Sequence, residues 1–329
     1  MGLSEIGEFG LIEKIKTAFS ESCFQKSGIR GIGDDCAIIS SGDIDWLIST
    51  DMLLEGTHFL RDRITPYDLG WKSLAVNLSD IAAMGGHPTG TFLSFGLPVD
   101  ISPEWVDEFT RGYRDLSRKW SVPLLGGDTT RSAGPREMIC INVGVLGNCP
   151  SGQCKMRDAA LPGDNIFVTG TLGDSSAGLD LILRGDVGKY APLVTKHLHP
   201  EPRIEEGLIL RQTEGVHAMM DISDGIASDL KHILTASGVS AEIQLDLLPI
   251  STELEAWGKE YGENALEKAL AGGEDYELLF TAKEGVTIPI KLKATKIGRI
   301  IPVMGNTIGY YRNGKKENIS FSGYNHFKK

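Results

Sequence analysis

Aspartates flanked by small residues recur along nearly the whole chain. They stand in the segments GIGDD (31–35), STD (49–51), NLSD (77–80), GGDTT (126–130) and DISDG (221–225), and GGED (272–275) follows. Most come after a short apolar run, as expected for a carboxylate at the end of a strand or helix that faces open space. Converging carboxylates repel one another unless cations neutralise them, and Mg²⁺ binds through carboxylates and substrate phosphates. The pattern therefore predicts Mg²⁺-nucleotide chemistry.

Each of these segments alone has an ordinary structural explanation. Gly-Asp pairs are common in turns, and aspartate is a common helix N-cap. Asp224, for example, stands at the start of a helical pattern. Several such segments in one chain, each after an apolar run, nevertheless favour a shared site, because active sites gather carboxylates.

Composition is that of a globular chain of two domains. The 329 residues are 41% hydrophobic and 23% charged, and the net charge is −11. We expect no nucleic-acid partner, since phosphate backbones are bound by Lys and Arg. No stretch of about 18 apolar residues occurs, so we expect no membrane span.

The cysteines and the N-terminus indicate the compartment. Five cysteines are scattered without a C-x-x-C pair, which favours a reducing environment over a disulfide framework or a zinc site. The first ten residues lack a basic segment followed by an apolar one, so we expect no signal peptide. These features predict a cytoplasmic protein.

Strand and helix patterns alternate in both halves. Residues 45–50 predict a strand that delivers Asp51, and a helix opened by Thr65-Pro66 carries Asp80 near its end. Residues 148–164 have prolines, glycines and no apolar period, as expected of a domain junction. We therefore predict an α/β (α+β) fold with an N-terminal domain at 1–147 and a C-terminal domain at 148–329.

Phosphate-binding segments are less distinct. The chain has no G-x-x-x-x-G-K-[ST] motif and no kinase glycine loop. GTLGDSSAG (170–178) and GGDTTRS (126–132) could offer backbone N–H groups to an anion, but plain turns explain both about as well. Four single residues have a possible binding role beside an ordinary one, namely His58, Tyr113, Arg157 and Tyr324.

The ordered motifs together resemble those of the thiamine-monophosphate kinases. They are GIGDDCA, ISTDMLLEGTHF, LAVNLSDIAAMGG, LLGGDTTRS, PGDNIFVTG, DISDGIASDL and GGEDYELLF, and the resemblance extends from residue 7 to residue 327. The wider superfamily includes aminoimidazole-ribonucleotide synthetase. The resemblance implies its two-domain architecture, an ATP cleft between the domains, and a homodimer.

The resemblance also implies site residues. The implied Mg²⁺ ligands are Asp35, Ser49, Thr50, Asp51, Asp80, Asp128, Asp221 and Asp224. The implied ATP contacts are Tyr113, Gly127, Asp128, Arg157 and Ser223. His58, Glu274 and Tyr324 would line the thiamine side, whereas Asp34 would support its turn without binding metal.

The implied reaction is ATP-dependent phosphorylation of thiamine monophosphate to thiamine diphosphate, the last step of thiamine diphosphate biosynthesis. The acceptor is a phosphate monoester, which is largely dianionic at neutral pH because its second pKa is about 6. It needs no general base, and none is obvious. The obstacle is repulsion between phosphates, which several Mg²⁺ ions would cancel during direct in-line transfer without a phosphoenzyme.

Two alternatives stay open from the sequence. One is another ATP-using enzyme of the superfamily, with aminoimidazole-ribonucleotide synthesis as the main rival. The other is a noncatalytic Mg²⁺-nucleotide-binding protein, which the retention of all the acids disfavours.

Overall fold

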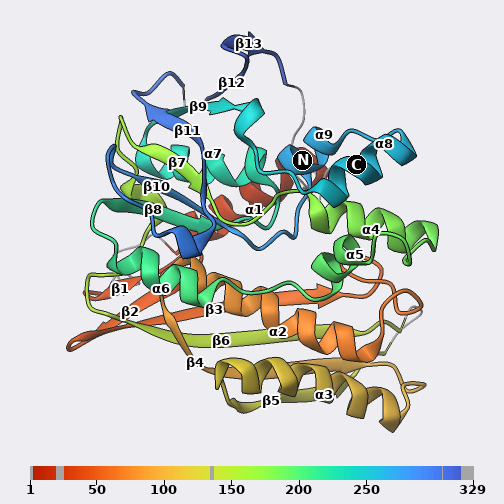
Figure 1. The fold of residues 1–329 in the computed structure, drawn as a ribbon. Helices are drawn as coiled ribbons and strands as arrows, with labels where there is room; N and C mark the ends of the chain where they lie inside the picture. Colours follow the sequence, from red (N-terminus) through yellow and green to blue (C-terminus); the bar gives the residue numbers. More distant parts are fainter. Residues whose placement is uncertain (1–2, 20–25, 134–136, 306, 320–329) are drawn as a thin grey trace.

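The computed structural model describes residues 3–19, 26–133, 137–305 and 307–319. Two mixed sheets with helices packed on them make up the fold (Figure 1). The first sheet has the strand order β1-β2-β3-β6-β4-β5, and every neighbouring pair is antiparallel except β4 and β5. Its strands are β1 (Ile29–Arg30), β2 (Ala37–Ser41), β3 (Ile44–Leu54), β4 (His87–Leu97), β5 (Leu124–Arg131) and β6 (Cys140–Pro150).

Two long helices, α2 (Pro66–Ala83) and α3 (Pro103–Trp120), lie beside this sheet (Figure 1). Each begins with a side-chain N-cap followed by proline, Thr65 before α2 and Ser102 before α3, which satisfies the first free N–H groups. The two helices touch through glycines. A Cβ at Gly70 would lie 2.0 Å from the carbonyl oxygen of Phe109, so even alanine would force the helices apart.

The other face of the first sheet is open in the single chain. Side chains along β3 alternate between buried and exposed, as in any strand with one covered face. On the exposed face Trp46 and Ile48 are 37% and 36% accessible, and Met52 and Phe92 are more so. An exposed apolar face of this kind is typical of a surface that contacts another protein.

The second sheet has the strand order β13-β12-β9-β11-β7-β10-β8, and only β9 and β12 are parallel neighbours. Its strands are β7 (Asn165–Val168), β8 (Val216–Asp221), β9 (Ser240–Gln244), β10 (Leu278–Ala282), β11 (Thr295–Ile301), β12 (Ile308–Arg312) and β13 (Lys315–Glu317). The remaining helices are α1 (Leu3–Ala18), α4 (Asp174–Arg184), α5 (Ala191–Leu198), α6 (Ile204–Gln212), α7 (Ile226–Ser237), α8 (Thr252–Tyr261) and α9 (Ala265–Ala271), with short 3₁₀ turns at Arg157–Ala159, Leu245–Leu247 and Ile290–Leu292.

The largest hydrophobic core runs across both halves of the chain. It joins the covered face of the first sheet and α2 to Met219 and Phe280 of the second sheet. A separate core lies on the second sheet with α7 and α9, and a smaller one surrounds Trp257 between α4, α5 and α8. Helix α2 therefore packs against both halves, and its polar residues lie where the halves meet.

The predicted fold class is confirmed, and the differences from expectation concern strand ends. Asp51 and Asp128 lie inside strands and not after them, because β3 stays paired with β6 as far as Leu54 and β5 stays paired with β4 as far as Arg131. Strand β6 continues to Pro150, which is beyond the predicted end of the N-terminal domain at residue 147. None of the helices in the described part of the chain has the length and apolar character needed to cross a membrane.

Candidate active site

A cavity of about 870 Å³ lies where the two halves of the chain meet. Its walls come from the loop before β2, from β3 and the segment after it, from α2, from α4, from the end of β8 and from residues 271–276. The site is thus built by segments from both ends of the sequence, and none of these segments could form it alone.

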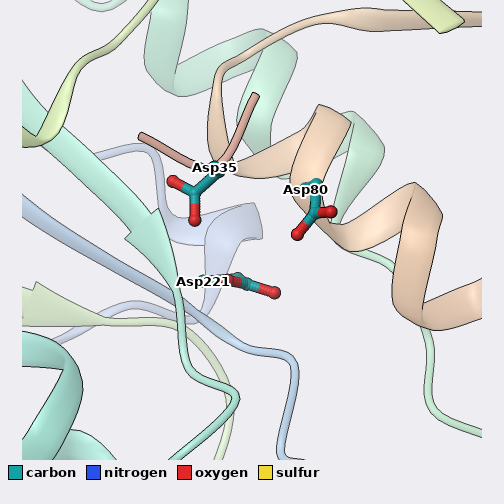
Figure 2. A group of neighbouring side chains, drawn as sticks. All are labelled: Asp35, Asp80 and Asp221. Atoms are coloured by element: carbon teal, nitrogen blue, oxygen red, sulfur yellow. The ribbon is translucent and has the colours of Figure 1, made fainter. Parts of the chain in front are cut away.

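Three carboxylates gather at one end of the cavity. Oxygen atoms of Asp35, Asp80 and Asp221 all lie within 4.8 Å of one another, and Figure 2 shows the three side chains around a shared space. Asp35 comes from a loop, Asp80 from α2 and Asp221 from the last position of β8. Asp51 and Asp224 line the same cavity.

Hydroxyl groups and one arginine hold these carboxylates in place. Ser49 donates a 2.6 Å hydrogen bond to Asp80, and Ser79 donates a 2.5 Å bond to Asp221. The Arg157 guanidinium pairs with Asp35.

Asp34 has a different place, because its two carboxylate oxygens accept the backbone N–H groups of Asp35 and Arg157 at 3.1 Å. It supports the loop, as expected.

The electrostatics of the cluster favour a cation. Burial, followed by repulsion from Asp35, raises the pKa of Asp221 from 3.8 to about 7. Burial and the neighbouring carboxylates Asp51 and Asp221 raise the pKa of Asp80 well above its usual range, and burial and Asp35 raise that of Asp51. Carboxylates that resist ionisation together in this way become stable anions when a cation lies between them.

The donor set fits Mg²⁺. All three donors are hard carboxylate oxygens from three different segments. Opposite ligands of an octahedral Mg²⁺ lie about 4.2 Å apart, since each Mg–O bond is about 2.1 Å. Oxygens within 4.8 Å of one another can meet that geometry with small side-chain adjustments. Three protein carboxylates leave positions open for phosphate oxygens and water.

Glu274 lines the cavity away from these carboxylates, because it pairs with Lys72, which stands eight residues, or about 12 Å, before Asp80 on α2. His58 and an apolar wall line the cavity as well. The members of this wall are Leu53, Phe59, Leu60, Ile64, Leu179, Ile182, Leu183 and Leu198. His58 accepts the backbone N–H of Leu54 at Nδ1, at 3.0 Å. The neutral ring then carries its proton on Nε2.

Residues 272–276 are held in a strained conformation that aims side chains into the cavity. Glu274 and Tyr276 have φ angles of 65° and 50°, which non-glycine residues rarely adopt. The backbone N–H of Glu274 donates to the carbonyl of Ser223 at 2.7 Å. At Gly273 a Cβ would lie 2.5 Å from the same carbonyl oxygen, so only glycine fits. Strain of this kind clusters at functional sites.

Most residues singled out in the sequence line this cavity. They are Asp35, Ser49, Asp51, Asp80, Asp221, Asp224, Arg157, Ser223, His58 and Glu274. Thr50, Tyr113, Gly127 and Asp128 are not among its lining residues. Tyr324 lies outside the described residues.

Thr50 and Asp128 lie on the open face of the first sheet. Thr50 alternates with Ser49 and Asp51 along β3, and its hydroxyl donates to the carbonyl of Val143 at 3.1 Å. Asp128 pairs with Ser94, and every residue of β5 is exposed in the single chain. Asp51 on β3 and Gly127 on β5 stand in the same row of the sheet, separated by three strand spacings, which is a distance of about 14 Å.

Gly127 and Tyr113 have structural explanations within the single chain. A Cβ at Gly127 would lie 1.7 Å from the carbonyl oxygen of Leu93, so the pairing of β4 and β5 requires glycine. Tyr113 is buried under the first sheet, and its hydroxyl donates to Thr91 at 2.7 Å. It reaches no part of the cavity surface.

The segment 170–178 does not offer a free anion site. The backbone N–H groups of Gly173 and Ser175 at the start of α4 donate to the carboxylate of Asp275, at 2.7 and 3.3 Å. A carboxyl group of the chain itself therefore occupies the N-terminus of α4, which favours the interpretation of this segment as a strand–turn–helix corner.

Sequence reasoning missed Lys72, His197 and Tyr276. His197 and Tyr276 line the cavity, and the Lys72 ammonium lies 3.0 Å from Glu274. The only signal for Lys72 is that it is the one charged residue in the helical run of residues 69–78, and nothing marked the other two.

Comparisons with known proteins agree with this architecture. The family described as AIR synthase related protein matches with its N-terminal domain at residues 33–149 and its C-terminal domain at 162–302. The thiamine-monophosphate kinase of Aquifex aeolicus is 38% identical over 331 residues, which cover 99% of this chain and 100% of that protein. The chain belongs to the thiamine-monophosphate kinase family. The family member of Escherichia coli strain K12 is 40% identical over 332 residues, 98% of each chain.

Solved structures of the thiamine-monophosphate kinase family share the fold. That of AaThiL complexed with AMPPCP and TMP has a TM-score of 0.88 at 37% identity and covers 99% of both chains. The hydrogenase maturation protein HypE in complex with ATP has a TM-score of 0.67 at 16% identity, covers 98% of both chains, and shares the fold alone.

Proposed function

We propose that this chain transfers the γ-phosphoryl group of ATP to thiamine monophosphate and forms thiamine diphosphate. The full-length similarity to thiamine-monophosphate kinases supports this reaction, as does the similarity to a structure that holds AMPPCP and TMP.

The observation that carries the proposal is that one cavity is lined by two unlike groups of residues. One group is the carboxylates of Asp35, Asp80 and Asp221, and the other is Glu274, His58 and an apolar wall. Thiamine monophosphate has two matching parts, a phosphate at one end and a cationic ring system at the other. It would bind with its phosphate toward the acidic end, and Glu274, His58 and Tyr324 would contact the ring system.

Mg²⁺ would be held by Asp35, Asp80 and Asp221, with Ser49, Asp51 and Asp224 beside them. Bound Mg²⁺ neutralises the phosphates and supports their in-line alignment. Ser49 and Ser79 keep two of the carboxylates oriented through their hydroxyls. Because the acceptor phosphate already carries negative charge at neutral pH, the chain needs no side chain that removes a proton.

ATP would bind beside the acidic end through Arg157 and Ser223, which both line the cavity. The Arg157 guanidinium is planar and suited to bidentate contact with phosphate oxygens. Its pairing with Asp35 places it next to the carboxylate cluster. Tyr113 has no part in this proposal, since its hydroxyl is committed to Thr91 in the core.

The working form would be a homodimer formed through the open face of the first sheet. Trp46, Ile48, Met52 and Phe92 make this face apolar, and the edge strand β5 is exposed along its whole length. A second copy of the same face would bury these side chains with the two-fold symmetry usual for dimers.

In such a dimer the residues of the open face would complete the partner's site. Thr50 and Asp128 lie on the open face, and Gly127 precedes Asp128 on the exposed edge strand β5, about 14 Å from Asp51. In the dimer, Asp128 and Thr50 would bind Mg²⁺ and Gly127 would contact ATP. The Mg²⁺ and ATP concerned would be those bound in the cavity of the second copy. We place the protein in the cytoplasm, without nucleic-acid or membrane partners.

Release of ADP from purified protein tests the reaction. The protein is incubated with ATP, Mg²⁺ and thiamine monophosphate, and free thiamine is the control acceptor. The expected result is turnover with the monophosphate alone and formation of thiamine diphosphate. Mg²⁺-dependent ATP binding without turnover would contradict the proposal and point to another substrate of the superfamily.

A further inference from the structure

A buried polar cluster outside the metal end of the cavity contains Lys72, His197, Ser175 and Glu274. Its members come from α2, α5, α4 and the strained segment before β10. The Lys72 side chain is only 1% exposed, whereas the Glu274 side chain is 28% exposed and lines the cavity. Lys72 therefore cannot reach a ligand, but its partner can.

The contacts within the cluster assign the role of each group. The Lys72 ammonium lies 3.0 Å from Oε1 of Glu274 and 3.2 Å from Nε2 of His197. An ammonium group only donates hydrogen bonds, so Nε2 of His197 is the acceptor and its proton is on Nδ1. That Nδ1–H faces the hydroxyl of Ser175 at 3.1 Å and Oε2 of Glu274 at 3.4 Å.

Charge supports the same arrangement. Burial, followed by the nearby Lys72, lowers the pKa of His197 to about 3, so the ring is neutral. Burial alone would raise the pKa of Glu274, but the Lys72 ammonium reverses this and holds it below its usual value. Glu274 is thus an ionised carboxylate, and its two oxygens contact Lys72 and His197.

We propose that Lys72 is a positioning residue for acceptor recognition, which fixes the Glu274 carboxylate toward the cavity through their ion pair and through His197. There the carboxylate receives the cationic thiazolium ring of the acceptor. This inference rests on the proposed function, because that function supplies the cationic ligand. Without Lys72, Glu274 would have to be ordered by the ligand itself, at a cost in affinity.

The test compares Lys72→Met with wild-type protein in two measurements. In turnover assays we expect the KM for thiamine monophosphate to rise about tenfold while the KM for ATP stays unchanged. In calorimetric titrations we expect thiamine, which has the cationic ring but no phosphate, to bind about tenfold more weakly. Lys72→Arg should recover part of the affinity, because it restores a cationic donor.

A double-mutant cycle separates positioning from general stability. Glu274→Gln should weaken thiamine binding by itself, and adding Lys72→Met to it should change binding little further. Independent, additive losses would overturn the inference. If Lys72→Met alone does not fold, the Lys72→Gln variant and the double variant, which leaves no unpaired buried charge, carry the same comparison.

Lys155→Met is the matched control. Lys155 is half-buried and, like Lys72, joins the two halves of the chain, because it donates to the carbonyl of Val216 at 2.6 Å, but it does not line the cavity. The Lys155→Met variant should leave the KM for thiamine monophosphate unchanged. Absence of turnover in wild-type protein would overturn the proposed function, whereas unchanged thiamine affinity in Lys72→Met would overturn the role of Lys72.

Discussion

Ser79 on α2 donates a 2.5 Å hydrogen bond to Oδ2 of Asp221 at the end of β8. Both residues are buried, and they lie 142 positions apart in the sequence. The bond joins the first half of the chain to the second at the floor of the cavity. It also orients one of the three clustered carboxylates.

We expect Ser79→Ala to lower the free energy of unfolding of the metal-free protein by about 1–3 kcal/mol, because a buried carboxylate loses its donor. Urea unfolding in the presence of a chelator measures this. Ser73→Ala is the control, since Ser73 lies buried on the same helix but donates to the carbonyl of Leu69 within that helix. A smaller loss in Ser79→Ala than in Ser73→Ala would contradict the importance of the inter-half bond.

Asp51→Asn and Asp80→Asn should each reduce turnover by orders of magnitude while the fold is retained. Both carboxyls line the acidic end of the cavity, and both have raised pKa values, from burial and from neighbouring carboxylates. Removing one charge therefore relieves repulsion in the metal-free state, and we expect thermal unfolding at an unchanged or higher temperature.

Asp45→Asn is a control for these two variants. Asp45 is a buried acid on the same strand, but it accepts hydrogen bonds from Ser40 and from the backbone of Gly152. The Asp45→Asn variant should be less stable than the wild-type protein but should keep its activity while it is folded. Near-normal turnover in both Asp51→Asn and Asp80→Asn would rule out the proposed metal site.

The stability of the metal-free protein should fall as pH rises from about 4 to about 7. Burial raises the pKa values of Asp34 and Asp221 from 3.8 to about 7, with Asp35 adding to each. The folded state then holds protons that the unfolded state has released, so stability is full below the unfolded value and is lost as pH rises through the folded one.

Mg²⁺ should reverse this trend, because metal ligands bind as carboxylates and proton release accompanies binding. We expect the Mg²⁺-induced rise in melting temperature to be larger at about pH 8 than at about pH 5.5. Calorimetry in two buffers of different ionisation enthalpy would count the protons released. A Mg²⁺ effect that is larger at the lower pH would contradict the prediction.

Mixing two inactive variants should restore activity if Asp128 serves the partner's site. Asp80→Asn damages the cavity of its own chain, and Asp128→Asn would damage that of its partner. Random exchange in a two-fold dimer makes half of the dimers mixed, each with one intact site, so we expect about one quarter of wild-type turnover. If Asp128 acted within its own chain, the mixture would stay inactive.

Trp46→Asp supplies the control for the mixing experiment. A charge on the open apolar face should prevent dimerisation, which analytical ultracentrifugation detects. Combined with either aspartate variant, it should abolish the recovery of activity. Recovery in a preparation that remains monomeric would contradict a role of Asp128 in the partner's site, and a Trp46→Asp protein that still dimerises would exclude assembly through this face.

Much of the acidic end of the site could be predicted from the sequence. Asp35, Asp80 and Asp221 each stand in a short motif beside small residues, and the structure brings their oxygens together. The helical run after Thr65-Pro66 and the alternation of strands and helices also gave the correct class of fold, because local periodicity depends only on which side chains face the core.

Other parts depended on contacts between distant residues. The strand that ends at Leu54 outlasts its apolar run because its partner strand continues, and no local pattern shows this. The sequence placed Asp51 after its strand, so it did not indicate that Thr50 and Asp51 point to opposite faces of β3, and the face of Asp128 follows only from sheet register.

The sequence by itself determined the types of group available, namely acids for Mg²⁺, small residues that leave space, and a helix that presents Asp80. The tertiary structure alone decided which groups meet. Lys72 and Glu274 are far apart in the chain and belong to unrelated local patterns, yet they pair at 3.0 Å across the two halves. The physical reason is that a buried charge must find a partner, and only the packing of α2 against the second half decides which partner lies within reach.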